Sequence, residues 1–387
     1  NDTVGKAGLE QYYETYLRGK NGEQKFYIDN VGRISEIISS TDSVAGDDLY
    51  LSIDADLQKA TYLALQNEIA AIVYSNIKSG EIPINDVYTA LIGNSVINTE
   101  HFSKSKASDT EKSVLSVFKS RQKTTLGKIK QELTSSPEAL NTMSDEVLDE
   151  FTYIISMLKD DQVLLKNEID TSDSVYQKWK DQKISPKEYL NYCITQHWID
   201  ISQLNVDEKY ADSTEVYDAL CKYILKNIKT DTEFSKIIYQ YMITRGEISP
   251  RQLCLILFDQ GVLDYDDATV NKLKNGSLSP RDFLMKKIYN IEITPAQLAL
   301  EPCIGSCVVT DEKTGEIRAM VSYPGYDSNK LANGVDSEYF ASLQHDKSSP
   351  LLNYATQQKT APGSTFKLVS ATAGLAENVI TTSDQIR

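Results

Sequence analysis

The stretch CVVTDEKTGEIRAMV, residues 307–321, consists of two short apolar runs on either side of a polar turn. Gly315 lies in that turn. Apolar runs around a turn that contains glycine predict a β-hairpin. Further along the chain, APGSTFKLV at 361–369 leads into the apolar run 370–375, and its Pro-Gly pair marks the start of a helix. Residues 303–387 are therefore predicted to combine strand and helix.

A second mixed region lies near the N-terminus. The apolar stretch LYLSID at 49–54 predicts a short strand, and Asp54 or Asp56 can cap the helix that follows. Before it, residues 9–17 have helical spacing, whereas residues 24–28 alternate between polar and apolar side chains between turn residues. We therefore expect a helix and then a strand in this region.

Between these regions, residues 76–302 are dominated by helical periodicity. A short phrase recurs there, in which Ile or Leu precedes Ser or Thr and then Pro, at 184–186, 248–250, 278–280 and 293–295. The hydroxyl can cap a helix, and proline fits the first helical position because no N–H is needed there. Three caps are followed at the third position by Glu188, Gln252 or Gln297, which predicts capping boxes. The irregular spacing of the phrases favours a bundle of short helices over a solenoid.

The composition limits the partners that the protein can have. The 387 residues include 40 Lys and Arg against 55 Asp and Glu, which gives a formal charge of −15. Nucleic-acid binding and electrostatic binding to an anionic bilayer both need a basic face, so we expect neither. No apolar stretch approaches the ~20 residues of a membrane span, and no signal peptide opens the sequence. The sequence starts inside a structured-looking segment and stops at Arg387 without an ending signal, so we expect a fragment.

Five cysteines and three histidines are scattered along the chain, without the spacing of a disulfide scaffold or a metal site. Three of the cysteines lie in apolar, helix-like stretches and are interpreted as small buried side chains. We expect neither a metal nor another cofactor.

The candidate reactive pair is Ser364 and Lys367. Residues three apart lie on one face of a helix, so the hydroxyl and the amine can meet. Serine needs a base to become a nucleophile. A lysine can act as that base when burial and the positive end of a helix disfavour its charge. The same helix N-terminus offers N–H groups to an oxyanion, so the pattern indicates acyl transfer through a serine ester.

The spacing alone is a weak signal, because Ser-x-x-Lys occurs five more times, in charged helical stretches that we interpret as solvated faces. These copies are Ser75/Lys78, Ser103/Lys106, Ser116/Lys119, Ser120/Lys123 and Ser156/Lys159. The pair at Ser364 differs in its setting, with Pro-Gly before it and an apolar helix after it.

Four motifs resemble penicillin-binding proteins. PGSTFK at 362–367 looks like their active-site serine motif. The hairpin at 309–324 resembles the first hairpin of their transpeptidase domain, and LSIDADLQ at 51–58 looks like the entry to that domain. Residues 5–19 are similar to the pedestal of the monofunctional, class B members. The middle of the chain resembles only the long helical insertion of some clostridial-type members.

The resemblance implies an α+β multidomain fold. Residues 1–48 would be part of the non-catalytic pedestal domain, and residues 49–75 would start the transpeptidase domain, which is β-lactamase-like. An all-α insertion would occupy residues 76–302. Residues 303–387 would continue the transpeptidase domain with the Ser-x-x-Lys helix, truncated at its C-terminal side.

The resemblance also implies a serine D,D-transpeptidase. Ser364 would attack the penultimate D-Ala carbonyl of a peptidoglycan stem peptide, with Lys367 as the base, and β-lactams would acylate the same serine. It implies a position on the extracytoplasmic side of the cell membrane, with other cell-wall synthesis proteins as partners.

The sequence departs from the family pattern in three places. Family members use a Ser-x-Asn and a Lys-Thr/Ser-Gly motif after the serine, and neither follows Ser364 here. Lys313–Gly315 spells the second motif but precedes Ser364, and we interpret it as a hairpin turn. Tyr354 stands where many members have arginine. We therefore expect the chain by itself to be inactive.

Two other interpretations stay open. In the first, the protein is a non-catalytic scaffold of a cell-wall synthesis complex that works through its helical insertion. In the second, it is a β-lactam sensor. Sensors resemble only the transpeptidase part, so the pedestal motif GLE at 8–10 counts against this interpretation.

Overall fold

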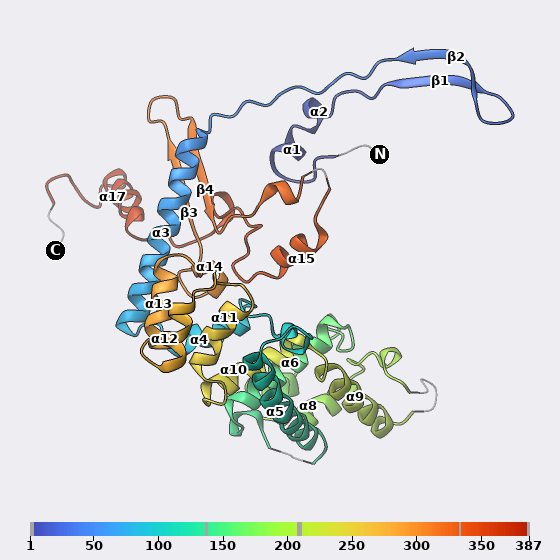
Figure 1. Cartoon of the computed structure of the whole chain (residues 1–387), viewed down its shortest axis with the longest axis vertical. Helices are drawn as coiled ribbons and strands as arrows, with labels where there is room; N and C mark the ends of the chain where they lie inside the picture. Colours follow the sequence, from blue (N-terminus) through green and yellow to red (C-terminus); the bar gives the residue numbers. More distant parts are fainter. Residues whose placement is uncertain (1–3, 136–137, 207–210, 333, 385–387) are drawn as a thin grey trace. The chain divides into compact units, whose positions relative to one another are not determined.

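The structure is a computed structural model that describes residues 4–135, 138–206, 211–332 and 334–384 (Figure 1). The chain forms two compact units. The first unit combines Asn1–Lys59 with Val308–Met320, and the second combines Ala60–Cys307 with Val321–Arg387. No helix among the described residues is both long and apolar enough to cross a bilayer.

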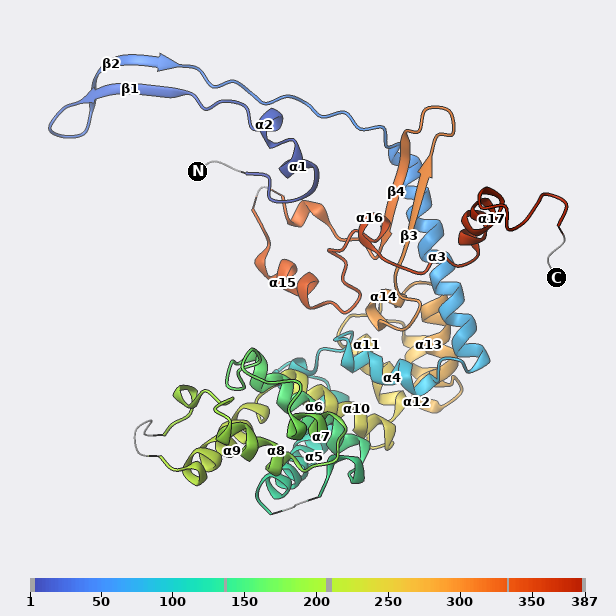
Figure 2. The same ribbon diagram turned by 180° about the vertical axis from the view of Figure 1, so that it is seen from behind.

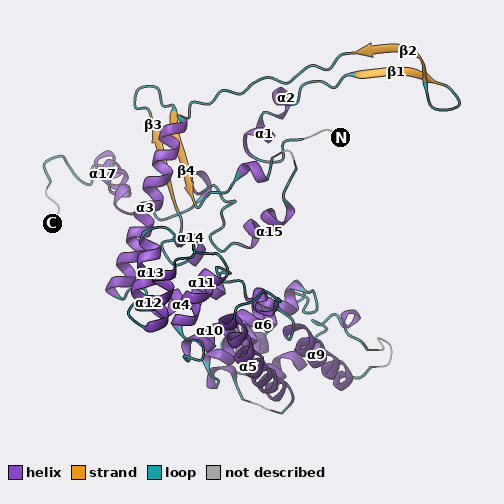
Figure 3. Cartoon of the chain, in the orientation of Figure 1, coloured by secondary structure: helices purple, strands orange, loops and turns teal. Residues whose placement is uncertain are grey.

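The fold is mixed α+β and mostly helical, as expected (Figure 3). In the described chain, the strands form two antiparallel hairpins. The first pairs β1 (Glu23–Ile28) with β2 (Ile34–Thr41). The second joins β3 (Gly305–Thr310) to β4 (Ile317–Tyr323) and confirms the hairpin predicted at 307–321.

Local signals in the first 54 residues are only partly correct. The strand predicted at 24–28 is β1. The helix predicted at 9–17 is divided at Tyr13 into α1 (Gly8–Tyr12) and α2 (Glu14–Leu17), because the backbone of Tyr13 leaves the helical region, at φ −104° and ψ 17°. The strand predicted at 49–54 is wrong, and this stretch is irregular. It touches β4 through single bonds rather than a ladder: the Asp54 N–H donates to the Arg318 carbonyl at 2.9 Å, and the Ser52 hydroxyl donates to the Ile317 carbonyl at 2.8 Å.

Helix α3 (Ala55–Ser79) begins at Asp54, whose carboxylate accepts the Leu57 N–H at 3.0 Å, so Asp54 rather than Asp56 is the cap. One turn later, the Gln58 side chain pairs with the backbone of Met320. Its Nε2 donates to the Met320 carbonyl at 2.6 Å, and its Oε1 accepts the Met320 N–H at 2.8 Å. The start of α3 is thereby fastened to the middle of β4.

Further along α3, aromatic and aliphatic side chains contact the C-terminal part of the chain. The Tyr62 ring lies 5.8 Å from the Tyr323 ring. A Cβ at Gly305, the first residue of β3, would lie 3.0 Å from Ile69 and 3.2 Å from Leu65, so the strand begins in close contact with α3. The helix continues through Ser79, and the domain boundary expected at 75–76 falls inside it.

The region expected to be an all-α insertion is a bundle of helices in the described chain. Figures 1 and 2 show its middle helices gathered into one body from both sides. The helices are α4 (Ile84–Gly93), α5 (Asp109–Thr134), α6 (Asp145–Asp160), α7 (Ser174–Lys180), α8 (Pro186–Thr195), α9 (Ser213–Ile228), α10 (Thr232–Thr244), α11 (Pro250–Asp259), α12 (Asp267–Asn275), α13 (Pro280–Tyr289) and α14 (Pro295–Leu298).

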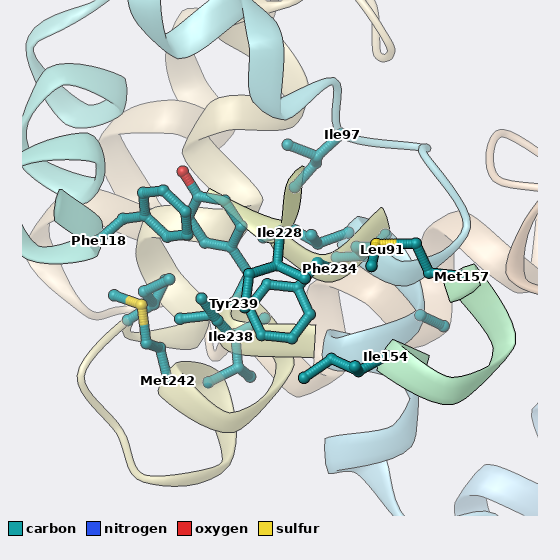
Figure 4. Packing of buried hydrophobic residues seen from close by; sticks show 14 of the residues in the cluster. Leu91, Ile97, Phe118, Ile154, Met157, Ile228, Phe234, Ile238, Tyr239 and Met242 are labelled. Atoms are coloured by element: carbon teal, nitrogen blue, oxygen red, sulfur yellow. The ribbon is translucent and has the colours of Figure 1, made fainter. Parts of the chain in front are cut away.

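One large apolar core holds this bundle together (Figure 4). Tyr239 of α10 stacks on Phe118 of α5 at 4.2 Å between ring centroids, and its edge meets Phe102 at 5.9 Å. Phe234 and Leu91 are fully buried in the same cluster. Contacts of this kind among helices far apart in the sequence give the bundle its stability, since short helices are marginal by themselves.

The recurring Ser/Thr-Pro phrases start helices as predicted. The hydroxyls of Ser185, Ser249, Ser279 and Thr294 each accept the backbone N–H three residues later. The reciprocal bond of a capping box is present at Gln252 and Gln297. For Glu188, only the bond from its N–H to Ser185 is found in the described chain, at 3.1 Å. The second bond of the box would bring the Glu188 carboxylate to the backbone N–H of Ser185, which is buried. The carboxylate would lose its hydration there, and the Glu188 side chain is exposed instead.

The bundle also buries the carboxyl group of Glu150, which has an oxygen without a hydrogen-bond partner among the described residues. Glu150 of α6 is 1% exposed, and its Oε1 has no hydrogen-bond partner among the described residues. Burial and then the nearby charge of Glu146 raise the pKa of Glu150 from 4.5 to about 8. Glu146 itself is held by the guanidinium of Arg245 at 2.8 Å.

We expect the protein to lose stability as the pH rises, and Glu150→Gln to suppress that loss. The folded state keeps the proton on Glu150 while the unfolded chain releases it above its ordinary pKa, so stability is present at low pH and falls through the folded pKa of about 8. The linkage amounts to roughly 3 kcal/mol between pH 5 and pH 8. Denaturant unfolding at both pH values measures it, with the exposed Glu68→Gln as control. An equal slope in wild type and Glu150→Gln contradicts the prediction.

Candidate active site

The turn of the β3–β4 hairpin carries Lys313–Gly315. The Asp311 carboxylate accepts the backbone N–H groups of Lys313 at 2.8 Å and Thr314 at 3.0 Å. Donation from Thr314 and then Lys313 lowers the pKa of Asp311. Gly315 adopts φ +76°, a conformation that favours glycine. The interpretation of this tripeptide as a turn is confirmed.

The end of β4 is tied to the segment that approaches the serine motif. The Ser322 hydroxyl lies 3.2 Å from Asn353 Oδ1 and accepts the Ala355 N–H at 3.3 Å. Asn353 also accepts the Ala355 N–H at 3.1 Å and thereby caps α16 (Tyr354–Gln357). Sequence reasoning missed Ser322 and Asn353, because their contact joins residues 31 positions apart and neither belongs to a recognised motif.

Tyr354 is an internal anchor in this chain. Its side chain is buried, and its hydroxyl donates to the Ser348 carbonyl at 2.6 Å. Burial is the largest influence on the phenol and raises its pKa, so the group is neutral. A neutral, buried hydroxyl in this position gives no positive charge to the site.

Ser364 and Lys367 lie on adjacent short elements. Ser364 is the middle residue of the 3₁₀ turn η5 (Gly363–Thr365), and Lys367 is in the first turn of α17 (Phe366–Ala376). Gly363 adopts φ +58°, which redirects the chain at the Pro-Gly pair and starts the helix there, as predicted. The N-cap residues of η5 and α17 make no side-chain cap bond.

The burial expected around this pair is not present in the described chain, where both Ser364 and Lys367 are exposed. The reason is packing: α17 contacts η5, and no side chain of α17 is buried. Its apolar residues are instead in the open, with Leu368 at 77% and Val369 at 55% exposure. Helix α17 thus presents an exposed apolar face.

The five other Ser-x-x-Lys pairs differ from this pair in setting rather than in exposure. All five serines are exposed, and the pairs in α3, α5 and α6 lie within long regular helices. None of these five serines follows a glycine with positive φ. The interpretation of these copies as surface positions agrees with the structure.

Four of the five cysteines are buried, and Cys307 is partly exposed. No group of three or more His, Cys, Asp or Glu side chains that could hold a metal ion occurs in residues 4–384 as described. Burial raises the pKa of Cys193 and of Cys254 to about 12, so these thiols are not nucleophiles at neutral pH.

Comparison with known families matches the two ends of the chain. Residues 305–387 match the family model described as penicillin binding protein transpeptidase domain, and residues 1–51 match the penicillin-binding protein dimerisation domain. No solved structure matches the chain at a significant level.

Short stretches of the chain also match curated proteins. The chain is 44% identical over 77 residues to the peptidoglycan D,D-transpeptidase PbpA of Mycolicibacterium smegmatis, a match that covers 19% of this chain and 16% of that protein. It is 43% identical over 74 residues to the peptidoglycan D,D-transpeptidase MrdA of Escherichia coli K12, which covers 19% of this chain and 12% of that protein. The matches therefore span less than a fifth of each relative.

The hairpin β3–β4, the Pro-Gly turn and the Ser-x-x-Lys pair all lie within the matched C-terminal segment. The C-terminal end of the chain is therefore similar to the transpeptidase domain of penicillin-binding proteins, and the N-terminal end is similar to their dimerisation domain.

Proposed function

We propose that this chain is part of a class B penicillin-binding protein that cross-links peptidoglycan stem peptides through an acyl-enzyme on Ser364. The main support is the position of Ser364 in a Pro-Gly-Ser-Thr-Phe-Lys turn inside the segment that matches the transpeptidase family. The match of residues 1–51 to the dimerisation domain supports the assignment to the class with a pedestal.

The proposed reaction has two steps. Ser364 Oγ attacks the penultimate D-Ala carbonyl, its proton passes to Lys367, and the terminal D-Ala leaves with a proton. An amine of a neighbouring stem then attacks the ester, takes the acyl group and restores the hydroxyl. A β-lactam enters the first step in place of the stem, and its opened ring remains on the serine. Backbone N–H groups of the turn at Ser364 are the expected oxyanion donors.

We further propose that the apolar face of α17 is covered by other parts of the transpeptidase domain in the whole protein. Covering this face excludes water from Lys367, which favours the neutral amine that a base needs. The same proposal places the protein at the extracytoplasmic side of the cell membrane, where its substrate is, with other cell-wall synthesis proteins as partners. The helical block 76–302 would be an insertion in this domain.

A scaffold role is the second candidate, because the bundle has a large core of its own and presents its surface independently of the serine motif. The match to the dimerisation domain disfavours the β-lactam sensor. A labelling experiment separates the enzyme from the scaffold.

We expect the whole protein that contains this sequence to form a covalent penicillin adduct on the peptide that carries Ser364. The experiment is incubation with benzylpenicillin, protease digestion and mass spectrometry of the peptides. Heat-unfolded protein is the control, since acylation needs the folded turn. An adduct on a different serine refutes the assignment, and a folded protein without any adduct supports the scaffold.

A further inference from the structure

A cavity of about 490 Å³ opens between the C-terminal half of α3 and α13, far along the chain from Ser364. Its volume falls within the ~300–1,000 Å³ of small-molecule sites. The walls consist of two tyrosines, three basic side chains and a methionine: Tyr74, Tyr289, Lys78, Arg281, Lys286 and Met285. Aromatic rings and cations are thus gathered around one hollow.

The acidic side chain on the cavity, Asp282, is already engaged. Its Oδ2 accepts the Ser279 hydroxyl at 2.7 Å in the cap of α13, and its Oδ1 lies 3.9 Å from Arg281. The Arg281 guanidinium also donates to the Ile77 carbonyl at 3.2 Å, which fixes its position at the end of α3. One cation of the cavity is therefore held in place and partly neutralised.

The two lysines of the cavity are not engaged in this way. Lys78 and Lys286 are exposed, and neither ammonium group makes a hydrogen bond or a salt bridge among the described residues, although the Lys286 charge helps to lower the pKa of Glu292. The neighbouring Lys287, in contrast, is bonded to Glu292 and turned away over the Phe283 ring. The cavity consequently has a net positive charge in a chain whose formal charge is −15. This local reversal of sign favours a small anion.

The two rings indicate the shape of the ligand. The Tyr74 and Tyr289 centroids are 5.1 Å apart with an angle of 59° between the ring planes, so they form an open corner rather than a parallel slot. Tyr289 is 58% exposed, and Met285 is buried behind the rings. The exposed face of Tyr289 is therefore open to a ligand, and a saturated sugar ring can place C–H groups against such an electron-rich face.

We propose that this cavity binds a small acidic sugar, whose carboxylate or phosphate lies between Lys78 and Lys286 while its ring packs on Tyr74 and Tyr289. Arg281 orients the site from the end of α3. A long polyanion is disfavoured, because the rest of the chain repels it. The proposal does not depend on acyl transfer at Ser364.

The test is calorimetric titration of the whole protein at low salt with simple probes. Glucuronate and glucose 6-phosphate have both ring and anion, glucose has only the ring, and acetate and inorganic phosphate have only the anion. We expect the first two to bind at least roughly fivefold more tightly than the others, since ring and charge act together. Whichever of glucuronate and glucose 6-phosphate has the higher affinity shows whether the site prefers a carboxylate or a phosphate. Equal affinity for glucose, or for the ring-free anions, overturns the proposal, as does no binding by any probe.

Variants locate the binding. Lys78→Gln with Lys286→Gln should weaken binding of the acidic sugars roughly tenfold, and Tyr289→Ala should weaken binding of glucuronate while leaving that of acetate unchanged. Matched controls are Lys222→Gln with Lys226→Gln on α9 and the exposed Tyr265→Ala. Circular dichroism confirms that each variant is folded. Equal losses in the control variants show that binding occurs elsewhere and overturn the assignment to this cavity.

Discussion

Ser364→Ala is expected to abolish covalent labelling of the whole protein by penicillin. The side-chain oxygen is the atom that becomes part of the ester, so its removal leaves nothing for the β-lactam carbonyl to join. The exposed position of Ser364 predicts little change in folding. Fluorescent penicillin followed by gel electrophoresis measures the loss, and thermal unfolding confirms that the variant is folded.

Ser116→Ala is the matched control, because Ser116 is also exposed and also precedes a lysine by three residues, within α5. It should label at the wild-type level. Persistent labelling of folded Ser364→Ala would assign the nucleophile to another residue and would remove the main support for the proposed function.

Lys367→Ala should slow acylation by about 10²–10⁴-fold, the contribution of a positioned general base. Lys367 lies in the first turn of α17, beside the turn that carries Ser364. Stopped-flow acylation rates over a range of pH give the comparison, and Lys119→Ala in α5 is the control. Recovery of the mutant rate as hydroxide increases would support loss of a base, whereas a uniform loss at all pH values would indicate a positioning role. A folded mutant that acylates at the wild-type rate contradicts the proposal.

The features that the sequence predicted well are those with local causes. The β3–β4 hairpin follows from two apolar runs and a turn that needs Gly315, and the helix starts follow from Ser/Thr-Pro caps. The serine motif was located from its Pro-Gly pair, and the structure places Gly363 in the conformation that this pair suggests. Such signals act within a few residues, so they can be recognised in the amino-acid sequence without knowledge of the fold.

The features that the sequence did not predict depend on distant partners. Gln58 bonds to Met320 across 262 positions, and residues 49–54 meet β4 without forming a ladder. The exposure of α17 depends likewise on which elements pack against it, because its own apolar composition suggested burial. The roles of Ser364 and Lys367 stay predictions that the labelling experiments test.

The bonds between Gln58 and Met320 have a consequence for how freely the chain between them can change in length. They bring together two points separated by 262 positions. The side chain of Asn94, the residue that caps the end of α4, donates to the Leu298 carbonyl of α14, so the first and last helices of the bundle are joined as well. The intervening helices therefore form a loop closed at its base. Loop-closure entropy rises only with the logarithm of loop length, by about 0.6 kcal/mol for each doubling. Lengthening this loop by further helices therefore costs little closure entropy at the base formed by Gln58 and Met320.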